Sequence, residues 1–124
     1  MKTKTKTGFI AIPALNGAMG GRIDPQNKKD VRGLIAMHKA AVALSKKAWE
    51  DRNNDSRLSA AVYAALERRE RRYGDRAEAL LAPLGIKCDW PGLYPSFTVM
   101  GFGYHDPESA VLAALGHPMN WLCA

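Results

Sequence analysis

The sequence predicts an α+β domain in which a long antiparallel helical hairpin packs on a small sheet of two or three strands, followed by a short C-terminal helix. Three observations support this prediction. Apolar residues recur with helical spacing from residue 25 to residue 81, a polar turn near residue 54 divides that stretch, and β-type runs flank it on both sides. Because strands flank the hairpin in sequence, we expect the first and last strands to meet in space.

Length and composition fit one globular domain. The chain has 124 residues, of which 47% are apolar and 24% are charged, close to the average for globular proteins. Lys and Thr alternate near the N-terminus, so we expect residues 1–7 to form a basic flexible arm and residues 8–124 a single α+β domain. The apolar stretch at 9–15 contains a proline and is much shorter than the roughly 20 residues that cross a bilayer. We therefore expect neither a secretory signal nor a membrane span.

The first part of the domain is expected to contain one short strand and one long helix. Residues 8–12 are a β-type apolar run, and the glycine-rich residues 16–21 form a loop. Asp24 and Pro25 are a typical helix start, because aspartate caps a helix and proline suits its first position. The helix is expected to continue to about Arg52. Its apolar side, which requires a broad packing partner, consists of Val31, Leu34, Ile35, Met37, His38, Ala41, Val42, Leu44, Ala48 and Trp49.

A second helix is expected after the turn at residues 53–55. Ser56 is a suitable N-cap, and Gly74 is a suitable residue to end the helix. Asp75 would then begin a separate short helix that ends near Leu81. Because the turn between the two long helices is short, these helices are expected to be antiparallel neighbours.

The C-terminal part is expected to add two strands and one helix. Residues 86–89 and 96–104 are the predicted strands, and both faces of the second are largely apolar, which favours a covered strand. Asp106 and Pro107 repeat the helix-start signal. The final helix is expected to end near Leu115.

The chain is strongly basic, and the charge is concentrated in its first two thirds. The formal net charge is +6, and 17 of the 18 lysine and arginine residues lie before residue 85. A positive field of this size favours acidic partners, such as nucleic acid, an acidic protein or an anionic membrane surface. Charge alone does not select among these classes.

Arginine is clustered near the predicted end of the second helix. Arg69, Arg72 and Arg76 continue the line of the apolar side, where a buried guanidinium would need a charged partner. One interpretation is that this end projects beyond the core and binds phosphates or carboxylates. The other is a solvated helix end in which Glu67 and Arg71 form an i,i+4 ion pair. The predicted binding residues are Arg68, Arg69, Arg71, Arg72, Arg76, Lys46 and Lys47.

Cysteine and histidine residues form no standard metal-binding motif. Cys88, His105, His117 and Cys123 have unsuitable spacing for a zinc site unless the fold brings them together. Two cysteines are also too few for a disulfide framework, so we expect reduced thiols in the cytoplasm. The sequence thus predicts no metal and no other cofactor.

Signals for catalysis are weak. Cys88–Asp89 and His105–Asp106 are adjacent pairs, but neighbouring residues in a strand point to opposite faces. The loop at 16–21 matches no phosphate-binding glycine motif. We therefore expect a protein that is not an enzyme, with a small enzyme whose site is unrecognised as an alternative.

The arginine cluster leads to two functional hypotheses. The first is a small basic binding protein that uses its arginine-rich helical face to bind nucleic acid or a nucleoprotein complex. The alternative is an inhibitor or adaptor that docks this face on an acidic protein groove, a type of accessory protein that phages and mobile elements often encode. In both cases we expect a monomer or weak dimer with no membrane partner. Salt-dependent binding to DNA and RNA discriminates between the two hypotheses.

Overall fold

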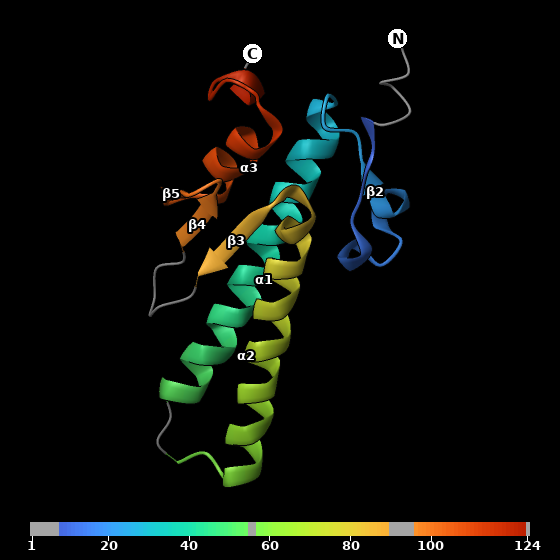
Figure 1. Ribbon diagram of the computed structural model, residues 1–124. Helices are drawn as coiled ribbons and strands as arrows, with labels where there is room; N and C mark the ends of the chain where they lie inside the picture. The colour runs from blue at the N-terminus through green and yellow to red at the C-terminus, as the bar shows by residue number, and fades with distance from the viewer. Residues whose placement is uncertain (1–7, 55–56, 90–95, 124) are drawn as a thin grey trace.

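Two long helices form the frame of the fold in the computed structural model, which describes residues 8–54, 57–89 and 96–123. Helices α1 (Lys28–Asn54) and α2 (Ala60–Leu81) pack antiparallel, and one end of this hairpin extends well beyond the other elements (Figure 1). The predicted α+β fold with a long helical hairpin is confirmed. The other strands and helices are β1 (Ile10–Ala11), β2 (Arg22–Ile23), β3 (Ile86–Asp89), β4 (Ser96–Val99), β5 (Phe102–Tyr104) and α3 (Pro107–Leu115), with short 3₁₀ helices η2 (Pro13–Leu15), η3 (Ala18–Gly21), η4 (Ala82–Leu84) and η5 (Trp121–Cys123).

Helix α1 begins three residues later than the sequence predicts. The Asp24 carboxylate accepts a hydrogen bond from the backbone N–H of Gln26 (2.9 Å), so it closes a local turn instead of capping the helix. Asn27 takes the capping role, because its side chain accepts a hydrogen bond from the N–H of Asp30 (3.1 Å). The expectation of a helix start at Pro25 was therefore wrong: the aspartate bonds within its own turn, as this residue type often does.

Helix α2 is continuous where the sequence predicts two helices. It is capped by Ser59, whose hydroxyl accepts a hydrogen bond from the N–H of Val62 (3.2 Å). The predicted cap, Ser56, lies outside the described residues, as does the predicted arm at 1–7. Gly74 does not end the helix, and no separate helix starts at Asp75. Burial of the last turns of α2 in the core outweighs the cost of about 1 kcal/mol that a glycine adds inside a helix.

The strands form two separate antiparallel sheets. β1 pairs with β2, Ile10 opposite Ile23, while β3, β4 and β5 form a sheet in that order. The expectation that the first and last strands meet was wrong, because the chain turns back after β1 and Ile12 donates a hydrogen bond to the carbonyl of Gly21 (2.8 Å). Figure 1 shows the two sheets on opposite sides of the hairpin.

The single strand predicted at 96–104 is a hairpin. Met100 and Gly101, which connect β4 to β5, both have left-handed backbone angles, with φ of 49° and 85°. A two-residue turn with two positive φ values matches the twist of a tight antiparallel hairpin. The residues on both faces of this segment therefore belong to two paired strands, and the register places Phe97 opposite Tyr104.

The core lies at the end of the hairpin where α1 begins and α2 ends. There the two helices meet η2, both sheets and α3. The largest fully buried side chains belong to Phe97, Ile12, Leu15, Ile23, Leu34, Leu80, Leu81, Leu112, His38, Val31 and Val111. Leu44 was expected in the core but is 47% exposed, because it lies on a side of α1 that the described residues leave largely uncovered. Within the described part of the chain, no helix is both long and apolar enough to cross a membrane.

Candidate functional site

The predicted arginines lie on the part of α2 that leads out of the core. Four of them, at positions 68, 69, 71 and 72, are exposed, and Arg76 is half-buried. Arg69, Arg72 and Arg76 have i, i+3, i+7 spacing and so share one side of α2, which we call the arginine row. At a rise of about 1.5 Å per residue, this row extends over about 10 Å of the helix. Arg71 is about 200° around the helix from Arg69 and lies on another side.

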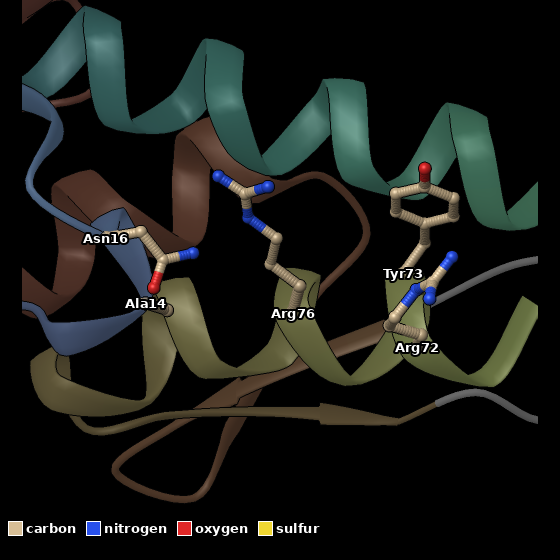
Figure 2. Close-up of a pocket in the computed structure, with 5 residues that line it drawn as sticks. All are labelled: Ala14, Asn16, Arg72, Tyr73 and Arg76. Atoms are coloured by element: carbon tan, nitrogen blue, oxygen red, sulfur yellow. The ribbon is translucent and has the colours of Figure 1, made fainter. Parts of the chain in front are cut away.

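A pocket of about 350 Å³ lies at the core end of the arginine row. It is lined by Arg72, Tyr73 and Arg76 from α2, together with Ala14 and Asn16 from and just after η2. Figure 2 shows the Arg76 guanidinium reaching from α2 toward α1, with the Asn16 carboxamide facing it from the η2 side. Sequence reasoning missed Asn16, because only the tertiary packing of η2 on α2 brings it to the row.

The arginines of α2 between residues 68 and 76 form no ion pair with a carboxylate in the part of the chain that the structure describes. In the described chain, ion pairs within 4 Å join Lys47 to Asp51 and Arg52 to Glu70, and none includes an arginine of α2 between 68 and 76. The i,i+4 pair of Glu67 with Arg71, which the solvated-helix interpretation requires, is not formed among these residues. The solvated-helix interpretation therefore lacks the ion pair on which it depended.

Glu70, in the middle of the arginine cluster, serves a structural role. Its carboxylate accepts hydrogen bonds from Nη2 (2.5 Å) and Nε (3.2 Å) of Arg52 on α1. Nη1 of the same guanidinium donates to the Tyr63 hydroxyl (2.8 Å), and both partners help to raise the Arg52 pKa above its ordinary value. Glu70 therefore connects the two helices instead of pairing with an arginine of its own helix.

The two predicted lysines lie on α1, apart from the arginine row. Ser45, just before them, faces α2 and donates its hydroxyl hydrogen to the Glu70 carbonyl (2.8 Å). Helical spacing turns Lys46 and Lys47 about 100° and 200° away from that face. Nζ of Lys47 is 2.8 Å from the Asp51 carboxylate. The hydrogen bond to this carboxylate raises the lysine pKa, and the negative charge of Asp51 offsets the positive charge of Lys47. Lys46 is the more available cation of the two.

The cysteines and histidines considered for a metal site do not converge. Among the residues that the structure describes, no group of three or more His, Cys, Asp or Glu residues could hold a metal ion. Cys88 is buried whereas Cys123 is exposed. The His117 ring stacks on Trp121 at 3.7 Å, and its Nε2 lies 2.7 Å from the Pro25 carbonyl oxygen. His117 therefore connects the C-terminal segment to the turn that precedes α1.

Two buried titratable groups belong to the core. Burial, with a smaller effect of Glu78, raises the pKa of Cys88 to about 12, so its thiol is neutral at neutral pH. His38 is fully buried, and its Nδ1 donates to the Ala77 carbonyl (2.8 Å), while its Nε2 has no hydrogen-bond partner among the described residues. Burial lowers the pKa of His38 below its ordinary value. Neither group offers a charged form suited to neutral-pH chemistry.

The glycine-rich loop lacks the setting of a phosphate-binding loop. Such loops place a bound phosphate at the N-terminus of the helix that follows them. Here η3, within residues 16–21, leads into β2, and α1 begins only at Lys28. The loop connects the two strands of the small sheet.

Comparison with known proteins yields no relative. No protein-family model, no curated protein and no solved structure matches this chain significantly. The functional argument therefore depends on the residues of the site and their geometry.

Proposed function

We propose that this protein is a non-enzymatic binding protein that uses the arginine-rich side of α2 to bind nucleic acid or a nucleoprotein complex. The observation that supports it most directly is the set of arginines on α2 that have no carboxylate partner within 4 Å in the described chain. A folded protein gains little from exposed like charges placed close together. Their presence on one short helical segment favours an anionic partner.

Phosphate chemistry fits this surface. A guanidinium presents several N–H donors in a planar fork, which matches the oxygens of a phosphate. Nucleic acid carries a regular series of such groups, at about 3.4 Å of axis per strand in duplex DNA, so several phosphates fall within the length of the arginine row. Phosphate contacts of this kind give affinity without sequence selectivity. We therefore expect binding that depends more on salt than on base sequence.

The test compares two variants that lose the same charge. The row variant carries Arg69→Gln, Arg72→Gln and Arg76→Gln; the control variant carries Lys29→Gln, Lys39→Gln and Lys87→Gln, three exposed lysines elsewhere. Affinities for a 20-mer single strand and a 20-bp duplex of DNA and of RNA are measured by fluorescence anisotropy at several salt concentrations.

We expect the row variant to bind at least about tenfold more weakly, through loss of charged hydrogen bonds. The slope of log affinity against log salt should fall by about two to three units, nearly one for each lost phosphate contact. Its melting temperature should stay within a few degrees, because none of the three arginines is fully buried or forms an ion pair in the described chain. Equal weakening by the two variants would show only a general field effect and would contradict a specific surface.

A protein partner is the second candidate, and the exposed apolar side chains near the row favour it. Val62 is 46% exposed and precedes Arg69 by two helical turns on the same side of α2, while Leu44 on α1 is 47% exposed. Arginine beside apolar groups is typical of protein interfaces. Capture of a partner from lysate by the parent but not the row variant, unaffected by nuclease, would support the inhibitor or adaptor function.

A cytoplasmic location and a monomer or weak dimer are part of this proposal. Two unpaired cysteines support a reducing compartment. Light scattering coupled to size exclusion measures the mass of the free protein, and a stable higher oligomer would contradict the proposal.

A further inference from the structure

The arginine row ends next to another segment of the fold. Toward the C-terminus of α2 it meets the segment that follows β1, because η2 packs against this helix. Ala14 and Asn16 from that segment line the same pocket as Arg72 and Arg76. A nucleic acid strand bound along the row from Arg69 toward Arg76 would therefore reach Ala14 and Asn16 at the pocket.

The pocket holds donors and carries no negative charge. Its lining combines two guanidiniums, one carboxamide, the phenol of Tyr73 and one alanine, with no carboxylate. Figure 2 shows the side chains of Asn16 and Arg76 at one end of the pocket and those of Arg72 and Tyr73 at the other. The guanidinium carbon of Arg72 is 5.6 Å from the centroid of the Tyr73 ring, a cation–π contact. This contact positions Arg72 without neutralising it.

Asn16 is held in place by its backbone. Its φ is 53°, in the left-handed region that asparagine tolerates better than most residues, and its N–H donates to the Pro13 carbonyl (3.0 Å). The backbone donor is thus used within the turn, and the side-chain amide is the group that faces the pocket.

The size and charge of the pocket select among phosphates. Its volume of about 350 Å³ is near the lower limit for small-molecule sites, so it has room for a phosphate and part of one nucleotide. An internal phosphodiester carries one negative charge, whereas a terminal phosphate monoester carries about 1.5 to 2 at neutral pH. Two guanidiniums in one pocket match the monoester better.

We infer that this pocket binds the terminal phosphate of a nucleic acid strand at the end formed by Arg76 and the Asn16 amide, with Arg72, at the other end beside Tyr73, on the neighbouring part of the same nucleotide. This inference rests on the proposed function and adds strand-end selectivity to it. The rest of the row, toward Arg69, then contacts internal phosphates close to that end.

The experiment uses 12-nucleotide single strands of one sequence that carry a 5′-phosphate, a 3′-phosphate or hydroxyls at both ends. Dissociation constants are measured at 0.15 M salt with an internal fluorophore. We expect one phosphorylated end to bind about tenfold more tightly than the hydroxyl strand, as extra charged hydrogen bonds would give. Inorganic phosphate and a nucleoside monophosphate, added at the strand concentration, should not displace it, because they lack the internal contacts.

Two variants test the pocket itself. Arg76→Gln removes one guanidinium, and Asn16→Gly removes the amide while keeping a residue that tolerates positive φ. Both should abolish or strongly reduce the preference for the phosphorylated end, whereas Lys87→Gln, an exposed lysine on β3, should retain it. Circular dichroism and melting curves confirm that each variant is folded.

The outcomes separate this inference from the proposed function. Equal affinity for all three strands would overturn strand-end binding and leave a general nucleic acid surface. Displacement by an equal concentration of inorganic phosphate or nucleoside monophosphate would instead identify a site for small phosphates, and would also overturn it. Absence of binding to every strand would contradict the proposed function itself.

Discussion

The two halves of the hairpin contain the same two helices but are held together differently. In the half near the start of α1, Leu34, Leu80 and Leu81 are fully buried among the sheets and α3. In the other half, Leu44 and Val62 are nearly half exposed. The first half is part of the core, and the second half projects from it (Figure 1).

In the projecting half, polar contacts between the helices accompany the packing of small side chains such as the buried Ala48. Ser45 donates to the Glu70 carbonyl, and the Arg52 guanidinium bonds both Glu70 and Tyr63. The arginine row begins in this half and ends at the edge of the core. We therefore expect the residues proposed for binding to contribute little to folding, so that mutations should separate binding from stability.

The largest difference should appear between two leucines on α1. Leu34→Ala should cost about 2–5 kcal/mol of unfolding free energy, because it leaves a cavity among buried neighbours. Leu44→Ala should change it by less than about 0.5 kcal/mol, since the side chain is nearly half exposed. Urea unfolding followed by circular dichroism measures both values. A similar cost for the two changes would mean that the halves are equally packed.

The buried His38 should make the core half sensitive to acid. Its pKa in the folded protein is lowered by burial, so between the ordinary value near 6.5 and that lower value the unfolded chain binds a proton that the folded chain does not. Stability should therefore fall as pH drops below about 6.5, by up to about 1.4 kcal/mol per pH unit. Urea midpoints from pH 8 to pH 5 measure this slope.

A pair of histidine variants assigns the effect. His38→Leu should flatten the pH dependence, whatever its stability at pH 8, while His105→Gln, at an exposed position, should leave the slope unchanged. The same slope in parent and His38→Leu would show that another group causes it.

The projecting half should depend on the ion pair between Arg52 and Glu70. A double-mutant cycle with Arg52→Gln and Glu70→Gln should give a coupling free energy of about 0.5–1 kcal/mol, which decreases at high salt. The Lys47–Asp51 pair, exposed on α1, is the reference and should give a smaller coupling. If the cycle at Arg52 and Glu70 shows no coupling, the polar contacts do not hold this half together.

A similarly small effect, in the stabilising direction, is expected at the junction of the two halves. A Cβ added at Gly74 would lie 3.5 Å from the Ser45 hydroxyl, an ordinary contact distance, and the residue is helical. Gly74→Ala should therefore stabilise the protein by about 0.5–1 kcal/mol, because alanine loses less conformational freedom in a helix. Thermal melts measure the change. A loss of stability would indicate that the helices must approach more closely at this point than the structure shows.

Local sequence signals determined the elements whose ends depend on local hydrogen bonds. The two amphipathic stretches of the hairpin and the short turn between them were sufficient to predict two antiparallel helices. The final helix begins as expected, because the Asp106 carboxylate accepts from the N–H of Ser109 (2.7 Å) and Pro107 occupies the first position. The arginine cluster itself was also evident from the sequence, because its composition is local.

Tertiary packing decided what local signals left open. Gly74 could end a helix or continue one, and burial of the turns beyond it favours continuation. Glu70 could pair with several arginines on its own helix, but Arg52 on α1 is within reach once the helices pack. Asn16 meets Arg76 only because η2 packs on α2. Contacts between residues distant in sequence depend on the relative placement of whole elements, which helix and turn propensities do not specify.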